Sequence, residues 1–170
     1  MEYSIQHIVT ITLVLLTGLS AGLCFTWSNA ITPGIGRLDD LSYLSAFQQM
    51  NRSILNPLFI LVFFGPFFLG LINLYLFKNA SNPMIWLMFL AIAFYFFGVV
   101  LVTIFGNVPL NEILDKTDLA SSSIEELKQH RSVFEVKWNR LHLIRTATSI
   151  ISFLFLLFSL TQSFKITSKL

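Results

Sequence analysis

Four long apolar runs without a charged side chain dominate this sequence. They cover Ile8–Ser28, Ile54–Phe77, Pro83–Gly106 and Thr146–Phe164. A helix needs about 20 apolar residues to cross about 30 Å of hydrocarbon. Inside lipid, only helices and closed barrels satisfy all of their backbone polar groups. These runs therefore predict an all-α, integral, multi-pass membrane protein.

We expect one membrane domain over residues 1–170, a bundle of four transmembrane helices. The composition agrees, because 55% hydrophobic and 12% charged residues lie outside the usual soluble range. A cleaved signal peptide is the competing interpretation of the first run, but its leading segment carries Glu2 and no Lys or Arg. The predicted spans are about 6–29, 54–77, 83–106 and 140–164.

Cysteine usage and charge exclude several functions. Cys24 is the single cysteine, so there is no intramolecular disulfide and no Cys-x-x-Cys thiol relay. The net charge is +2, and no basic stripe with interleaved aromatic residues lies outside the spans. We therefore predict no nucleic-acid partner.

Two long connections lie on the side opposite the termini. The first has a loop signal over Thr32–Gly36 and then an amphipathic helix over about 39–51, with Asp39 as a cap. In the second, Asn107 suits a helix cap before a helical region over about 108–138. A capping box at Ser122 and Glu125, or at Ser123 and Glu126, starts a further helix, which we expect to run unbroken into the fourth span. We expect short amphipathic helices to cap one mouth of the bundle.

The orientation rests on the distribution of basic residues. Lys78, Lys165 and Lys169 lie on the terminal side and the other eight Lys and Arg on the loop side. By number this favours cytoplasmic loops. The loop-side cations, however, sit among acids in helical connections, whereas the terminal side is short and almost purely basic. We therefore predict cytoplasmic termini.

Polar side chains gather at the loop-side ends of the spans. Alternating helix direction brings the end of an odd span beside the start of an even one, so these residues converge in one layer. In the fourth span, polar side chains recur every three to four residues and share a face. An Arg at the membrane centre costs about 2.5 to 3.5 kcal/mol, so this face should point into the bundle. The residues of this layer are Asn29, Asn51, Asn56, Asn107, Asn111, Trp138, Asn139, His142 and Arg145.

Each of these residues also has a simpler interpretation. Arg145 could extend to the interface, and Trp27 and Trp138 could form an aromatic belt. Each Asn could cap a helix or make an interhelical hydrogen bond. His142 is the only histidine near this mouth, which favours a functional role. A mononuclear metal site of His142 and Glu135 stays an alternative, but we predict no metal because no Cys cluster or Glu-x-x-His pair occurs.

Several segments together resemble the anthrone oxygenase-like family of small four-span membrane proteins, which is largely of unknown function. The segments extend over nearly the whole chain. They are GLSAGLCFTWSN from Gly18 to Asn29, Pro33, Gln48 with Asn51-Arg52, Asn56-Pro57, NVPLN from Asn107 to Asn111, and WNRLHLIR from Trp138 to Arg145.

The resemblance implies oxidation of a flat, apolar aromatic or quinol-like substrate by O2 without a cofactor. His142 would be the general base, and Arg145 would bind the developing oxyanion together with Asn139 and Asn107. Trp27 and Trp138 would line the entrance for a substrate from the bilayer. The candidate substrate-binding residues are Asn29, Gln48, Asn51, Asn56, Asn107, Asn111, Trp138 and Asn139.

Two other functions stay open. A non-catalytic membrane module could bind a lipid, quinone or protein partner at the polar mouth. A small channel or transporter is the third hypothesis, although the polar residues cluster at one face and leave no continuous hydrophilic path. The sequence leaves the substrate and the oligomeric state undetermined.

Overall fold

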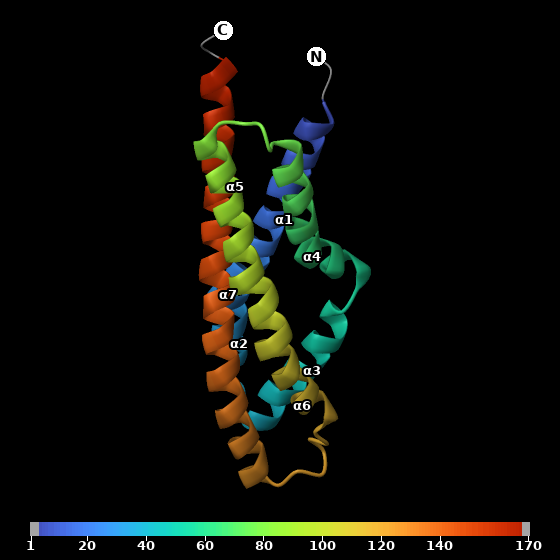
Figure 1. Cartoon of the computed structure of the whole chain (residues 1–170). Coiled ribbons are helices and arrows are strands. Elements are labelled where there is room, and N and C mark those ends of the chain that lie inside the picture. Colours follow the sequence, from blue (N-terminus) through green and yellow to red (C-terminus); the bar gives the residue numbers. More distant parts are fainter. Residues whose placement is uncertain (1–3, 168–170) are drawn as a thin grey trace.

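The computed structural model describes residues 4–167, with side chains as far as residue 161. Every regular element in this part of the chain is a helix (Figure 1). Four continuous helical segments are long and apolar enough to cross a membrane: Ile5–Ile35, Pro57–Leu76, Asn82–Lys116 and Ile124–Thr161. The prediction of an all-α, four-span membrane bundle is confirmed.

Two of these segments are α-helical throughout, and the other two contain π-helical turns. The first segment consists of α1 (Ile5–Thr26), η1 (Trp27–Ile31) and α2 (Thr32–Ile35), and α3 (Asp40–Ile54) follows it. The second and fourth are α4 (Pro57–Leu76) and α7 (Ile124–Thr167). The third consists of α5 (Asn82–Tyr95), η2 (Phe96–Leu101), η3 (Thr103–Asn107) and α6 (Val108–Lys116).

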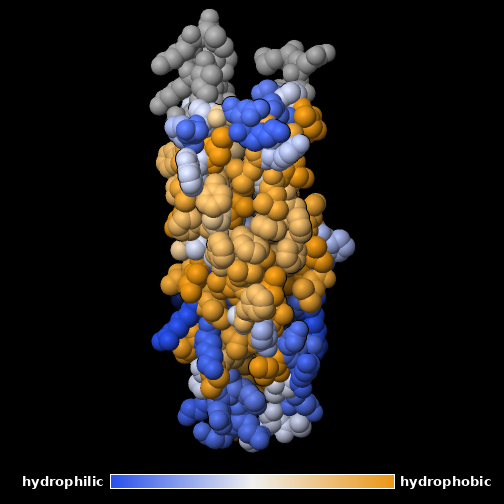
Figure 2. Space-filling view, viewed as in Figure 1, coloured by the Kyte–Doolittle hydropathy of each residue, from blue (hydrophilic) through white to orange (hydrophobic). Residues whose placement is uncertain are grey.

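The bundle packs α7 against α5 and α1, and α1 against α4. Small polar side chains tie these helices together. Ser152 of α7 donates to the Ala91 carbonyl of α5 at 2.8 Å, and Thr10 of α1 donates to Asn73 Oδ1 of α4 at 2.9 Å. On the face that Figure 2 shows, a hydrophobic belt lies between a polar end near the termini and a larger polar region around α3, α6 and the start of α7.

Two predicted helix starts are confirmed. The Asp39 carboxylate caps α3 by accepting from the Ser42 amide at 2.9 Å. Of the two possible capping boxes, Ser123 and Glu126 form the one at the start of α7, because each backbone amide donates to the other side chain, at 2.7 and 3.3 Å. From there α7 runs unbroken into the membrane, as its lack of Gly and Pro predicted.

Two predicted boundaries are wrong. The Thr32–Gly36 region continues the first helix as far as Ile35, and Asn107 lies inside the third helix, where its side chain makes no capping bond. In both places a π-helical turn ends two residues before a proline, Pro33 or Pro109. The wider turn gives the ring room that an α-helix would deny, so the proline does not end the helix.

A hydrophobic core holds the capping helices over the bundle. Its buried members are Trp27, Tyr43, Leu44, Phe47, Leu114, Leu119, Leu127, Phe134 and Trp138. Arg131 of α7 ties this cap together by donating to the carbonyls of Gly36 and Leu38, both at 2.7 Å. The predicted amphipathic helices therefore do cap one mouth. Lys169 lies outside the described residues, and the membrane orientation stays a prediction.

Candidate functional site

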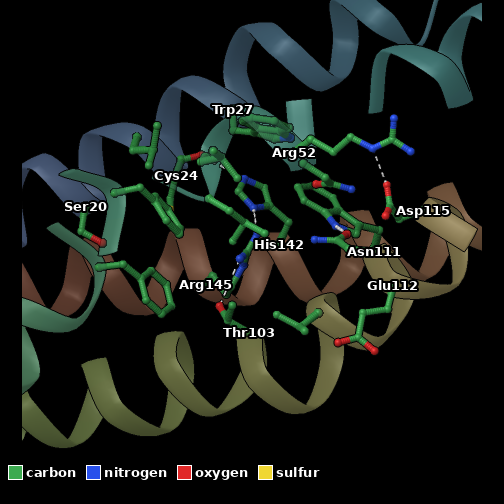
Figure 3. Close-up of a pocket in the computed structure, with 18 of the residues that line it drawn as sticks. Ser20, Cys24, Trp27, Arg52, Thr103, Asn111, Glu112, Asp115, His142 and Arg145 are labelled. Atoms are coloured by element: carbon green, nitrogen blue, oxygen red, sulfur yellow. Dashed lines mark hydrogen bonds and ion pairs between the residues drawn. The ribbon is translucent and has the colours of Figure 1, made fainter. Parts of the chain in front are cut away.

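A cavity of about 280 Å³ lies at the capped mouth (Figure 3). This volume is near the lower end of ligand sites, which are about 300 to 1,000 Å³. Its wall is mostly apolar, with a few polar groups. Residues from five helices line it: Ser20, Leu23, Cys24, Trp27, Asn51, Arg52, Ile54, Leu55, Phe59, Val62, Phe63, Thr103, Val108, Asn111, Glu112, Asp115, Lys116, Trp138, His142 and Arg145.

One face of α7 supplies the most reactive part of this wall. Trp138, His142 and Arg145 follow each other at helical spacing, and all three are buried. The His142 ring stacks on Trp138 with 4.8 Å between ring centres and 16° between planes. The Arg145 guanidinium lies 5.3 Å from the centre of the Trp138 ring. Trp138 therefore orients both polar groups through stacking and cation–π contact.

Hydrogen bonds determine which nitrogen of His142 carries its proton. Arg145 Nη2 lies 2.6 Å from His142 Nδ1, and a guanidinium can only donate, so Nδ1 accepts. His142 Nε2 lies 3.1 Å from the Cys24 carbonyl oxygen, which can only accept. Nε2 therefore carries the hydrogen, and the imidazole is neutral. Its basic lone pair, on Nδ1, faces Arg145 (Figure 3).

Arg145 is a buried cation with only neutral partners. Its side chain donates from Nη1 to Thr103 Oγ1 at 3.1 Å, besides the bond to His142. Within the described part of the chain it forms no ion pair with a carboxylate, and its Nε has no acceptor. An inward-facing Arg145 does not fit the interpretation in which this side chain extends to the membrane surface.

Two π-helical turns flank the site. η1 begins three residues after Cys24, whose carbonyl also accepts from Thr146 Oγ1 at 3.3 Å. η3 begins at Thr103, the acceptor for Arg145. Wider turns of this kind are frequent at functional sites because they re-aim backbone and side-chain groups. Sequence periodicity assumes regular helices, so it could not have revealed either turn.

Five of the predicted site residues line this cavity: His142, Arg145, Trp138, Asn51 and Asn111. Asn111 Oδ1 accepts from Trp138 Nε1 at 2.8 Å and so orients the indole. Asn51 is half-buried, and its Nδ2 has no partner among the described residues. The geometry brings these five together, while their functional roles stay predictions.

The other five predicted residues lie elsewhere. Gln48 donates to the carbonyls of Leu114 and Thr117 at 2.7 and 3.0 Å, where it closes the end of α6. Asn56 caps α4. Asn107 is buried and donates to the Trp138 carbonyl at 3.3 Å. Asn29 is exposed, Asn139 is half-buried, and neither lines the cavity.

Sequence reasoning missed Ser20, Cys24 and Thr103 as wall residues. Ser20, Cys24 and Trp27 repeat at three to four residues, a helical spacing that could have indicated a common face. Thr103 carried no such signal. Trp27 is only 8% exposed and packs against Phe47 and Trp138, so it belongs to the core and not to an aromatic belt.

The described residues contain no group of three His, Cys, Asp or Glu side chains placed to hold a metal ion. Glu135, the carboxylate considered as a partner of His142, instead accepts from Arg131 Nε at 2.9 Å. Both ring nitrogens of His142 are engaged as well. The two residues are therefore not arranged as a ligand pair.

A family model described as anthrone oxygenase matches residues 59–155. This match covers more than half of the 170 residues. The chain belongs to the anthrone oxygenase family. The suspected resemblance is thereby confirmed at family level.

The part of the chain that matches the anthrone oxygenase family includes Thr103, Asn111, Trp138, His142 and Arg145. The α1 side of the cavity, with Cys24 and Trp27, lies outside the matched residues. Comparison with curated proteins and with solved structures finds no match.

Proposed function

We propose that this protein is a membrane oxygenase that uses O2 to oxidise a flat, apolar aromatic or quinol-like molecule in the cavity at its capped mouth. One observation carries the proposal. A neutral imidazole and a guanidinium share one face of an otherwise apolar, aromatic-walled cavity, in a chain of the anthrone oxygenase family. A base beside a cation suits a reaction that removes a proton and leaves an oxyanion.

The His142–Arg145 hydrogen bond suggests how the base becomes available. A substrate carbonyl oxygen accepts from Arg145 Nη2 in place of His142 Nδ1. This exchange releases the Nδ1 lone pair to remove a proton from the substrate carbon. The Nε2–H bond to the Cys24 carbonyl then stabilises the imidazolium, much as a hydrogen-bond acceptor supports other catalytic histidines.

Proton removal creates an electron-rich enolate that reacts with O2. For a ring CH2 opposite a ketone, one oxygen atom stays on the carbon as a new carbonyl. The other leaves as water with the two hydrogens of that CH2 group. O2 is therefore the only oxidant that the reaction needs. The proposal uses no resident metal or flavin.

The cavity wall supports entry from the bilayer. Leu23 and Leu55 line the cavity and are also exposed on the outside, at 37% and 73%. They lie on α1 and on the break between α3 and α4. An apolar substrate dissolved in lipid can therefore reach the site sideways.

The test measures O2 uptake by detergent-purified protein with 1,8-dihydroxyanthrone, after subtraction of the spontaneous rate with heat-denatured protein. His142→Ala should lower the rate by about 10²-fold or more, because a positioned base contributes that much. His130→Ala, an exposed histidine of the same helix, is the matched control and should leave the rate unchanged. Normal turnover in folded His142→Ala would dismiss the general base.

A second outcome separates the alternative function. If the wild-type protein binds the anthrone and consumes no O2, the cavity belongs to a binding module and the oxygenase proposal fails. Oxygen uptake that survives metal chelation would in turn support a reaction without a resident metal.

A further inference from the structure

Among the residues that the structure describes, no carboxylate forms an ion pair with Arg145. The carboxylates that line the cavity, Glu112 and Asp115, lie on the exposed rim. Asp115 is already paired with Arg52 at 2.6 Å, and Lys116 is the fourth residue after Glu112 on the same helix. The rim therefore balances its own charge, and the interior of the cavity keeps one uncompensated positive charge.

The cavity wall also has an excess of hydrogen-bond donors. Three buried nitrogen atoms of wall residues have no partner within the described part of the chain: Arg145 Nε, Trp27 Nε1 and Asn51 Nδ2. All three are donors. The buried oxygen atoms without a partner belong to Tyr43, Asn107 and Asn139, none of which lines the cavity. The wall thus offers hydrogen bonds to a ligand that accepts them.

The shape of the wall indicates a ring system. Trp27, Trp138 and His142 lie on the side of α1 and α7, with Trp138 and His142 stacked. Phe59 and Phe63 of α4 form another stacked pair on the wall, with 5.4 Å between ring centres. Aromatic walls favour contact with the faces of a flat ring over contact with a flexible chain.

We propose that the cavity holds its ligand as an anion, a flat phenolate or the enolate that His142 generates, whose charged oxygen accepts hydrogen bonds from Arg145. This inference rests on the proposed function in that it names the charge state and class of the substrate. A buried cation is stabilised by an ionic partner, and a charge-assisted hydrogen bond is about twice as strong as a neutral one. Neutral molecules of the same shape fill the cavity without compensating Arg145.

The experiment uses two ligands of nearly equal shape, 2-hydroxyanthraquinone and its methyl ether. Trp86, the only tryptophan outside the site, is changed to Phe, so that quenching of fluorescence reports on Trp27 and Trp138. The phenol should bind at least about tenfold more tightly than the ether. At a pH where the free phenol is mostly neutral, its bound absorption spectrum should be that of the anion. Equal affinities, or a neutral spectrum, would overturn the inference.

Substitutions test whether Arg145 causes the difference in affinity between the phenol and its methyl ether. Arg145→Gln should reduce the affinity for the phenol to that for the ether. Arg140→Gln, the same change at an exposed position of α7, should retain the full difference. If Arg145→Gln fails to fold, the ligand pair on the unsubstituted site still decides the matter. A preference that survives in folded Arg145→Gln would contradict the assignment.

Oleate tests the ligand class, because it is an anion without a ring. Oleate that binds more tightly than the phenol would overturn the flat aromatic class. The O2 measurement separates the two proposals. Selective binding of the phenolate without O2 uptake would refute the oxygenase and leave the anion site. O2 uptake without ionisation of the bound ligand would refute the anion site and leave the oxygenase.

Discussion

Around the cavity, neighbouring groups decide which buried hydroxyl or ring nitrogen donates a hydrogen bond and which one accepts. Tyr95 Oη donates to the Phe63 carbonyl at 2.8 Å, and a hydroxyl has one hydrogen. The Ser20 hydroxyl, 2.8 Å from Tyr95 Oη, must therefore donate to it. Ser20 then offers only lone pairs at the deep end of the cavity, just as Arg145 forces His142 Nδ1 to accept. A carbonyl oxygen can only accept and a guanidinium can only donate. Each therefore fixes whether a neighbouring hydroxyl or imidazole nitrogen donates or accepts.

Tyr95→Phe removes the middle of the Ser20–Tyr95–Phe63 chain. We expect it to lower the stability of the bundle by about 1 to 3 kcal/mol, because buried partners lose their hydrogen bonds. Denaturant unfolding in micelles measures this loss. After Tyr95→Phe, a second change of Ser20→Ala should cost less than it does in the wild-type protein. Strict additivity of the two losses would contradict the shared chain.

Helices in this bundle approach each other closely where side chains are small. Gly98 of η2 faces Thr148 of α7, and a Cβ atom at Gly98 would overlap the Cβ, Oγ1 and Cγ2 atoms of Thr148. A rotamer change cannot relieve an overlap with a Cβ atom. This contact sets the separation between the third segment and α7 just beyond the Arg145 level, so it also positions the site.

Gly98→Ala should therefore destabilise the fold by about 1 to 3 kcal/mol through overpacking. The melting temperature in micelles reports the change. Gly22→Ala is the matched control, because nothing lies within 4 Å of the added Cβ, and it should be neutral or slightly stabilising. Thr148→Gly should rescue Gly98→Ala, whereas Thr148→Ala should not. Rescue by alanine would show that the overlap is not at Cβ.

The cap depends on one cation that joins two elements. Arg131 of α7 reaches the Gly36 and Leu38 carbonyls and the carboxylates of Asp40 and Glu135, the latter two at 3.1 and 2.9 Å. Only a planar guanidinium has enough directed donors for this arrangement. Arg131, near the start of α7, therefore holds the segment between α2 and α3 in place.

Arg131→Lys should loosen that segment although it keeps the charge. We expect faster amide hydrogen exchange over residues 36–43 and a loss of about 1 to 3 kcal/mol in stability. Arg140→Lys, at an exposed site on the same helix, should change neither quantity. Unaltered exchange in Arg131→Lys would mean that charge alone holds the segment.

The whole four-helix bundle places a polar site at the edge of the hydrophobic belt. The apolar helices fix the protein in lipid, the capping helices cover the mouth, and the break between α3 and α4 leaves Leu55 exposed beside the cavity. The cavity therefore borders the exposed apolar side chain of Leu55 on one side and a charged rim on another.

Leu55→Trp should narrow the lateral entrance and raise the KM for a lipid-dissolved anthrone, with kcat little changed, because the reacting groups stay in place. Leu58→Trp is the matched control, since Leu58 is exposed at 69% and does not line the cavity. O2 uptake in liposomes, with substrate expressed per lipid, measures both constants. An equal effect of the two substitutions would argue against this entrance.

Local sequence was sufficient for the presence of the four membrane-spanning helices, the cap at Asp39, a start of α7 near Ser123, and the common face of Trp138, His142 and Arg145. These depend on periodicity and on groups a few residues apart. Tertiary structure alone decided that Asn51 and Asn111 reach the cavity while Asn29 and Asn56 do not, and that His142 bonds to Cys24. Such contacts depend on how far each helix is rotated about its axis. π-helical turns change that rotation within a few residues, and the spacing of residues along the chain does not reveal the rotation.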